Sequence, residues 1–255
     1  MKVTFLGTGT SQGVPVIGCR CEVCRSLDYR DKRLRSSIHL SVNGQSLVID
    51  TGPDFRQQML REDITHLDAV LFTHAHRDHT AGLDDVRAYN FLQHINMPVY
   101  GTVETLRQIK NDFAYIFGLA DYPGLPRLKL QEIGENSFSI QGTPVTPLPV
   151  LHLKLPVLGF RIGDLSYITD ANFIPDDTYE KLKGTKVLVI NALQREQHIS
   201  HFNLSEAIEI VRKINPDKAY FTHISHKLGL HAAVDKELPE NISLAYDGLQ
   251  ISLES

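Results

Sequence analysis

Apolar positions follow strand and helix periods in turn along the first half of the chain. Strand-length hydrophobic runs lie at 3–6, 38–42, 47–50, 69–73 and 98–100. Asn43-Gly44 separates the second run from the third and is a typical hairpin turn. Helical spacing of apolar residues covers 53–62, 81–93 and 103–117. Strands that alternate with helices in this way predict an α/β fold.

The second half of the chain begins with a different pattern. Between residues 127 and 169, apolar runs are interrupted by glycine and proline, which predicts a mainly antiparallel group of strands. Two further buried strands are expected at 187–190 and 219–222, with a helix at 205–214 between them. A chain of 255 residues with 42% hydrophobic content can bury one large core, so we expect a single domain over residues 1–255.

The overall charge and the N-terminal sequence narrow the class of protein. The chain has 26 basic and 30 acidic residues, a formal net charge of −4, and no long basic run. This balance argues against an extended nucleic-acid-binding surface, although a metal site can still attract a small anion. No apolar stretch approaches the ~20 residues of a membrane span, and no apolar signal region precedes the first strand. We therefore expect a cytoplasmic protein with no membrane association.

The three cysteines form one cluster. Cys19, Cys21 and Cys24 follow Gly18 in a C-x-C-x-x-C knuckle. In a reducing compartment such a cluster indicates a bound metal rather than disulfides. Three thiolates need a fourth ligand from elsewhere in the chain to complete a tetrahedral zinc site.

A second candidate metal site follows the buried run at 69–73. His74, His76, Asp78 and His79 come directly after that run. Successive side chains of an extended strand point to opposite faces, so His74 and His76 share a face if the backbone stays extended. Imidazole and carboxylate are the usual ligands of zinc and related divalent metals, and four of them are too many for one tetrahedral site. The motif therefore predicts two neighbouring metals.

Three later strand ends each carry a further candidate ligand. His152 follows a strand at 145–151, Asp170 follows 165–169, and His223 follows 219–222. Binding residues gather on loops at one edge of a packed sheet, so these strand ends can converge on the same cleft. Asp50 also ends a strand and is a candidate to orient the ligand imidazoles from behind.

The H-x-H-x-D-H motif resembles that of the metallo-β-lactamase superfamily. Residues 9–15, the cysteine knuckle and the segment 222–226 are similar to the PhnP-like phosphodiesterases of that superfamily. The resemblance covers essentially the whole chain and implies a metallo-β-lactamase fold, a four-layer αββα sandwich, with the knuckle as an insertion around 18–35. It implies a structural zinc on the three cysteines and His226.

The same resemblance implies how the catalytic ligands are shared. One metal takes His74, His76 and His152, the other takes Asp78, His79 and His223, and Asp170 bridges the two. The resemblance implies that both catalytic metals are divalent: two zinc ions, two manganese ions, or one of each. Imidazole and carboxylate ligands bind zinc as well as manganese.

His201 matches a catalytic histidine of these phosphodiesterases and lies just before the helix at 205–214. We expect it to protonate the leaving oxygen while a hydroxide bridging the metals attacks phosphorus, with Asp78 also in the catalytic set. The implied function is hydrolysis of small phosphodiesters, cyclic nucleotides or ribose cyclic phosphates among them. The relatives suggest a homodimer. His198 matches no ligand position and is expected to be an ordinary surface histidine.

Three other functions are alternatives to phosphodiester hydrolysis. A nuclease that processes transfer-RNA 3′ ends would need a basic arm, which the acidic balance disfavours. An iron-dependent oxidoreductase on the same scaffold is the second alternative, but its diiron relatives carry a glutamate where His76 stands. The third is a non-catalytic metal-binding module, which the complete set of ligands and His201 disfavour.

Overall fold

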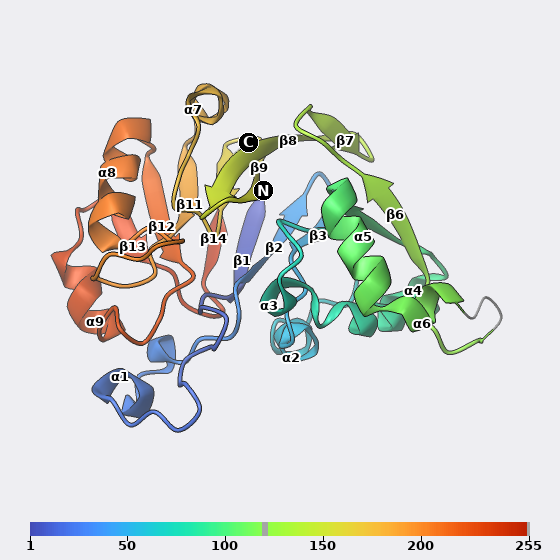
Figure 1. The fold of residues 1–255 in the computed structure, drawn as a ribbon, viewed down its shortest axis with the longest axis horizontal. Coiled ribbons are helices and arrows are strands. Elements are labelled where there is room, and N and C mark those ends of the chain that lie inside the picture. The colour runs from blue at the N-terminus through green and yellow to red at the C-terminus, as the bar shows by residue number, and fades with distance from the viewer. Residues whose placement is uncertain (119–121, 254–255) are drawn as a thin grey trace.

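The computed structural model describes residues 1–118 and 122–253, and its described part forms two facing sheets with helices on their outer sides (Figure 1). The first sheet has the strand order β14 (Gln250–Ser252), β1 (Lys2–Gly7), β2 (Ser37–Val42), β3 (Gln45–Ile49), β4 (Ala69–Leu71), β5 (Met97–Gly101), β6 (Leu128–Glu132). The second has the order β13 (Ile242–Leu244), β12 (Lys218–Thr222), β11 (Val187–Asn191), β10 (Leu165–Ile168), β9 (Leu155–Ile162), β8 (Thr143–His152), β7 (Phe138–Ile140).

Helices form the two outer layers. On the first sheet lie α2 (Phe55–Arg61), α3 (Arg77–Thr80), α4 (Arg87–Gln93), α5 (Val103–Asp112) and α6 (Ala114–Gly118). On the second lie α7 (Asp176–Leu182), α8 (Leu204–Ile214) and α9 (His231–Val234). The short helix α1 (Glu22–Arg25) projects away from both sheets (Figure 1). No helix in the described ranges is long and apolar enough to span a membrane.

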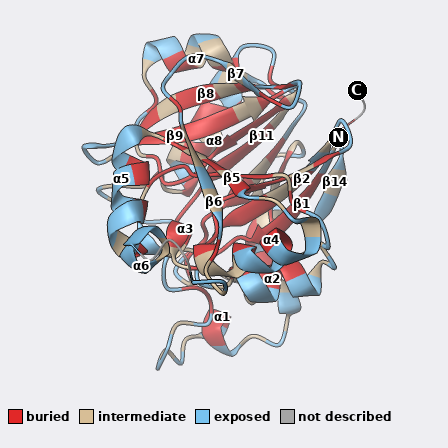
Figure 2. Cartoon of the chain, turned by 90° about the vertical axis from the view of Figure 1, so that its right-hand side faces the viewer, coloured by how far each residue is buried: buried red, intermediate tan, exposed pale blue. Residues whose placement is uncertain are grey.

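Three apolar cores hold the layers together. Phe5 and Ile38 of the first sheet meet Phe160 and Tyr167 of the second in the central core, and all four are fully buried. A second core joins the first sheet to α2, α4 and α5, and a third joins the second sheet to α7, α8 and α9. Buried residues accordingly line the interior, while the outer helix faces are exposed (Figure 2). Burial of such side chains is the main favourable term in folding, and the order of layers confirms the αββα sandwich.

Several expected elements differ in detail. The helix expected at 81–93 begins as a 3-10 turn, Leu83–Val86, before α4. The helix expected at 103–117 is divided into α5 and α6, because Phe113 leaves the helix and is buried against the first sheet. The mainly antiparallel group of strands expected at 127–169 does not include β6, which lies in the first sheet and pairs in parallel with β5. The reason is that α5 serves as the crossover that parallel pairing requires.

Candidate metal centre

The predicted ligands gather at one edge of the sandwich. Strands β3 and β4 run parallel in the first sheet, and β10, β11 and β12 run parallel in the second, with β8 in the same direction. Their carboxyl ends therefore meet at a common edge. The residues that follow or end these strands at that edge are Asp50, His74, His76, Asp78, His79, His152, Asp170 and His223.

Three of these residues have a left-handed backbone. The φ angles of Asp50, Asp170 and His223 are 67°, 54° and 53°. A non-glycine residue rarely adopts this conformation, which costs on the order of 1–3 kcal/mol and persists where surrounding structure holds it. In each case the chain turns sharply where a strand ends, which leaves the side chain at the common edge.

His74, His76 and His152 lie close together. Their ring centroids are 4.5 Å apart for His74 and His76, 5.3 Å for His76 and His152, and 6.0 Å for His74 and His152. His76, the residue before α3, keeps an extended backbone. An extended backbone at this point is the condition under which His74 and His76 were expected to share a face. The H-x-H half of the motif and the later histidine therefore meet although 76 residues separate His76 from His152.

Asp170 is the centre of the cluster. Its Oδ2 lies 3.2 Å from His79 Nε2 and 3.2 Å from His223 Nδ1, and its Oδ1 lies 3.2 Å from His201 Nε2. Thr169 Oγ1 donates a hydrogen bond of 2.7 Å to Oδ2. Asp170 is 2% exposed, so one buried carboxylate faces three imidazoles.

Asp50 orients His79 from behind, as the sequence suggested. Its carboxylate accepts hydrogen bonds from Thr73 N (2.9 Å), Thr73 Oγ1 (2.8 Å) and His79 Nδ1 (2.7 Å). Asp50 and His79 are both fully buried. Because Nδ1 donates to Asp50, the Nε2 atom of His79 is the one presented to the cluster. A ligand imidazole held through its other nitrogen keeps its tautomer and orientation.

Burial and charge act in opposite directions on the titrating groups. Burial lowers the pKa of His74 and His152, and it lowers the pKa of His223 to about 4, which keeps these rings neutral and able to bind a metal. Burial also disfavours charge on His79 and Asp170. Nevertheless, Asp170, Asp50 and Asp78 together raise the pKa of His79, and His223 and His79 lower the pKa of Asp170.

Two buried nitrogen atoms at this cluster lack a hydrogen-bond partner among the described residues. They are His74 Nε2 and His79 Nε2. The two carboxylates near His79 Nε2, at 3.2 and 3.3 Å, do not have hydrogen-bond geometry. A buried polar atom left unpaired costs about 1–3 kcal/mol. Imidazole nitrogens that converge with carboxylate oxygens are the donor set of a divalent cation, so the residues present fit a metal.

The division of ligands between two metals stays a prediction. Three groups of ligand atoms lie within 4.8 Å of one another: His74 with His79 and Asp170, His152 with Asp170 and His201, and Asp78 with Asp170 and His223. Asp170 belongs to all three, as a bridging ligand would. His76 belongs to none of them, and His74 groups with His79 rather than with His152.

His201 points into the cluster from the loop between β11 and α8. Its side chain is 11% exposed, and its Nε2–H faces Asp170 Oδ1 at 3.2 Å. Its Nδ1 contacts Ser200 Oγ at 3.1 Å and His198 Nδ1 at 3.2 Å. The expectation that His198 is an ordinary surface histidine was wrong, because its ring helps to set the orientation of His201. The H-x-x-H spacing of the two histidines was the available signal.

Local hydrogen bonds position the His201 loop. Phe202 N donates to Ala171 O at 2.8 Å, which ties the loop to the residue after Asp170. Ser200 O accepts from His152 Nδ1 at 2.8 Å. Directly after the loop, a capping box between Asn203 and Glu206 begins α8. The loop therefore holds His201 against two other members of the cluster.

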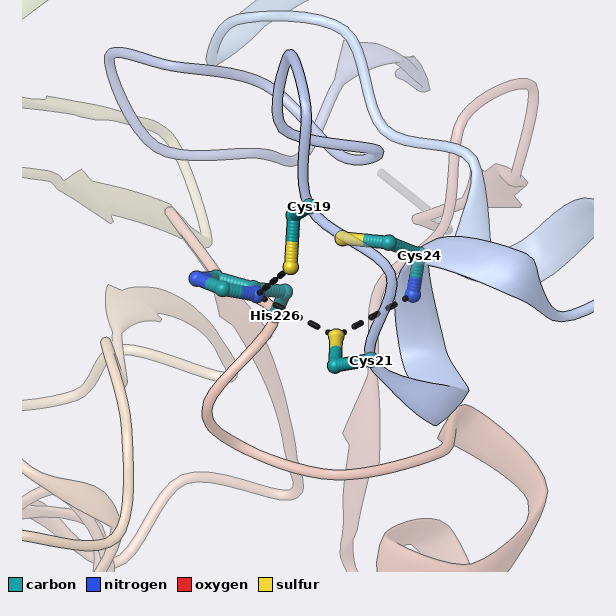
Figure 3. A group of neighbouring side chains, drawn as sticks. All are labelled: Cys19, Cys21, Cys24 and His226. Atoms are coloured by element: carbon teal, nitrogen blue, oxygen red, sulfur yellow. Dashed lines mark hydrogen bonds between the residues drawn. The ribbon is translucent and has the colours of Figure 1, made fainter.

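The cysteine knuckle forms a second, separate cluster (Figure 3). Cys19, Cys21, Cys24 and His226 have their ligand atoms within 4.8 Å of one another. His226 Nδ1 lies 3.4 Å from Cys19 Sγ and 3.3 Å from Cys21 Sγ. Zinc–ligand distances of ~2.3 Å for sulfur and ~2.0–2.1 Å for nitrogen place such atoms about 3.5 Å apart in a tetrahedral site. The Cys24 backbone N–H and His226 lower the pKa of Cys21 to about 6, which favours the thiolate that binds metal.

The knuckle is connected to the main cluster through one short loop. His223 and His226 are three residues apart after β12. Ile224 between them donates from its N to Thr8 O at 2.8 Å, and Ser225 N donates to Leu193 O at 2.9 Å. The loop is therefore fixed at the backbone between its two candidate metal ligands.

Replacing Cys21 by serine is expected to remove the knuckle metal and to lower the thermal midpoint, because binding at a closed site and local order are coupled. Zinc content and a melting curve on the same sample would measure both. Arg20→Ser, at an exposed neighbouring position, is the matched control. Full zinc content with an unchanged midpoint in Cys21→Ser would show that the knuckle is not a metal site.

A cavity of about 830 Å³ opens beside the main cluster. His74, Ala75 and His76 form its inner end. Its walls come from the first turns of α5 and the start of β9, and its outer end from residues 132–135. This volume is within the range of ~300–1,000 Å³ typical of small-molecule sites.

Comparison with known proteins agrees with this architecture. Residues 45–224 match the family described as Beta-lactamase superfamily domain. The chain is 40% identical over 257 residues to the octanoyltransferase of Porphyromonas gingivalis, covering 100% of this chain but only 52% of that protein. It is 28% identical to the ribonuclease Z of Mycobacterium sp. (strain KMS), over 77% of this chain and 70% of that protein.

A solved structure shows a much fuller match. It is that of a new diphosphatase from the PhnP family, with a TM-score of 0.92 and 40% identity over 98% of this chain and 96% of that one. The αββα sandwich with an imidazole and carboxylate cluster at its strand ends defines a metallohydrolase. The chain belongs to the metallo-β-lactamase superfamily and is a member close to the PhnP-like proteins.

Proposed function

We propose that the protein is a metal-dependent phosphodiesterase that hydrolyses small phosphodiesters, cyclic nucleotides or ribose cyclic phosphates among them. The observation that carries this proposal is the buried carboxylate of Asp170, in contact with His79, His223 and His201 beside unpartnered imidazole nitrogens. Similarity to the PhnP-family diphosphatase supports a phosphate ester as substrate.

Two divalent metals, zinc or manganese or one of each, would be held by seven residues: His74, His76, His152, Asp78, His79, His223 and Asp170. When bound, such a pair supplies a water of lowered pKa and positive charge for the phosphate oxygens. A structural zinc would be held by Cys19, Cys21, Cys24 and His226. Because the clusters are separate, the proposal implies three ions per chain.

The other steps belong to the protein's own side chains. His201 holds a proton on Nε2, the atom that faces the cluster, and this proton is available to a departing alkoxide oxygen. His198 and Ser200 hold the ring from its Nδ1 side. Asp50 keeps His79 in the tautomer that presents Nε2. These contacts fix the reacting groups before substrate binds, which is the protein's main contribution to such a reaction.

A nuclease acting on transfer RNA is the alternative to which the ribonuclease Z relative points. A polyanion of that size is bound mainly through phosphate contacts to lysine and arginine. The cavity beside the metal cluster instead carries Glu104, Glu132 and Glu135. We therefore favour a small substrate. The octanoyltransferase relative is about twice the length of this chain, so its name assigns no activity here.

Steady-state rates on a panel of linear and cyclic phosphodiesters, phosphomonoesters and diphosphates would test this proposal. The metal content would be measured on the same sample, purified without chelator. We expect diesters to be the best substrates, close to three metal ions per chain, and activity that is lost with a chelator and restored by zinc or manganese. Faster hydrolysis of a monoester or a diphosphate, or a content near one ion, would contradict the proposal.

A further inference from the structure

Asn191 is the last residue of β11 and lies between the strand ends that carry Asp170 and His223. Its main chain pairs with Thr222 of β12, the residue before His223. On the other side, the pairing of β10 with β11 stops after Ile168, so the chain that follows β10 has left the strand ladder. The backbone groups of this departing segment need other hydrogen-bond partners.

The side chain of Asn191 supplies those partners. Its Oδ1 accepts a hydrogen bond of 2.9 Å from Ala171 N, and its Nδ2 donates one of 3.0 Å to Ala171 O. Both residues are fully buried. The amide therefore binds both backbone polar atoms of the residue directly after Asp170. An ionised carboxylate at this position could accept from Ala171 N but could not donate to Ala171 O.

Ala171 O is also the atom to which the His201 loop is tied. Phe202 N donates a hydrogen bond of 2.8 Å to it. A carbonyl oxygen has two acceptor sites, and here Asn191 and Phe202 occupy both. The residues that precede the two ends of this link, Asp170 and His201, are therefore placed relative to each other through Ala171 O.

The metal cluster depends on this placement in two ways. Asp170 has a left-handed backbone with a φ angle of 54°, and such a conformation persists only where the surrounding structure holds it. Its Oδ1 also lies 3.2 Å from His201 Nε2, a contact between two loops that are far apart in the sequence. Both features are set by the backbone at Ala171, which Asn191 holds from two sides.

We propose that Asn191 is a positioning residue of the metal centre, which holds Asp170 in place as a ligand and keeps His201 at its distance from that ligand. The part that concerns His201 rests on the proposed phosphodiesterase function. Without the amide, Ala171 loses two buried hydrogen bonds, and the loops of Asp170 and His201 can move apart. Metal affinity and protonation of the leaving oxygen are then both weakened.

Asn90 provides a matched control in the same chain. It is a fully buried asparagine of α4, on the outer side of the first sheet (Figure 1). Its Oδ1 accepts from Arg127 N at 2.8 Å, and its Nδ2 donates to Arg127 O at 2.9 Å. Both asparagines thus bind the two backbone polar atoms of one residue, but Asn191 does so next to a predicted metal ligand. Asn191→Leu and Asn90→Leu remove these contacts and keep a side chain of similar size.

The zinc affinity of the main cluster is measured first, by competition with a chelator of known affinity. We expect Asn191→Leu to bind zinc there about 10–10²-fold more weakly than the parent, the usual effect of removing an outer support of a metal ligand. The knuckle ion should be retained, because its ligands form a separate cluster. Asn90→Leu should keep the parental affinity, although both variants lower the thermal midpoint, since each leaves buried backbone groups unpaired.

Turnover at saturating zinc then tests the link to His201. On a ribose cyclic diester we expect Asn191→Leu to lower kcat about tenfold or more, within the usual contribution of a general acid, with KM nearly unchanged. In the His201→Ala background the same substitution should cost less than about threefold, because a residue that acts through His201 then has no acid to position. A merely structural role would give equal losses in both backgrounds.

Parental zinc affinity in Asn191→Leu, an equal loss in Asn90→Leu, or equal kcat losses with and without His201 would overturn the proposal. If Asn191→Leu does not fold, Asn191→Ala and Asn90→Ala remove the same hydrogen bonds and take the place of the leucine variants in both measurements. If the parent hydrolyses no diester, the proposed function fails, and the zinc affinities alone decide whether Asn191 positions Asp170.

Discussion

Asp170→Asn is expected to lose on the order of 10²–10⁴-fold in affinity for the metals of the main cluster, and hydrolytic activity with them. The carboxylate is buried and faces His79, His223 and His201. Removing one partner of a buried charged pair costs ~3–5 kcal/mol, and each ~1.4 kcal/mol is tenfold in a binding constant. Asparagine keeps the shape and also tolerates the left-handed backbone at this position. The loss of metal affinity in Asp170→Asn therefore reflects removal of the carboxylate charge and not backbone strain.

Metal titration and elemental content are the measurements for this variant. The knuckle metal is an internal control, because its ligands lie in a separate cluster, and one ion per chain should remain. Asp177→Asn, in the first turn of α7, is the matched control and should keep three. If Asp170→Asn retained the full metal content and parental affinity, a bridging role for this residue would be excluded.

His201→Ala is expected to slow hydrolysis of an alkyl or ribose cyclic diester by roughly 10²–10⁴-fold, the usual contribution of general acid catalysis. Its Nε2–H faces the cluster, 3.2 Å from Asp170 Oδ1. An alkoxide leaves poorly without a proton, whereas p-nitrophenolate is stable as an anion. The loss on bis-p-nitrophenyl phosphate should therefore be small.

The comparison of the two leaving groups distinguishes this role from substrate binding. If His201 mainly held the phosphate in the ground state, KM would rise and kcat would change little on both substrates. Equal losses of kcat on both, with intact metal content, would rule out general acid catalysis. His66→Ala, at an exposed histidine that contacts Asp68, serves as the control and should match the parent.

The sequence predicted the strand ends and their chemistry better than it predicted contacts across the sheets. The apolar run at 69–73 and the motif after it are local, so periodicity and spacing were enough. Strand and helix alternation predicted an α/β fold, and the αββα order of the layers was implied by the resemblance to the metallo-β-lactamase superfamily. The place of β6 in the first sheet depends on how α5 packs against that sheet. The local sequence pattern does not predict this packing.

The hydrogen bonds that support the site were the least predictable part. Thr73 and Thr169 look like ordinary strand residues, yet each donates to a buried carboxylate. His198 was set aside because it matches no ligand position, and its contact with His201 arises only from the fold of the loop. Interactions of this kind depend on tertiary positions to within a few tenths of an ångström, which residue type and spacing do not specify.

The three-residue spacing of His223 and His226 determines where this chain can be lengthened. One residue of extended chain spans ~3.3–3.6 Å, while a metal ligand must be placed to within ~0.2 Å. An insertion between these two histidines would therefore displace one of the two clusters, since Ile224 and Ser225 are also fixed by backbone hydrogen bonds. The exposed turn at Asn43-Gly44 has no such constraint on its length, so a tag or a reporter loop belongs there.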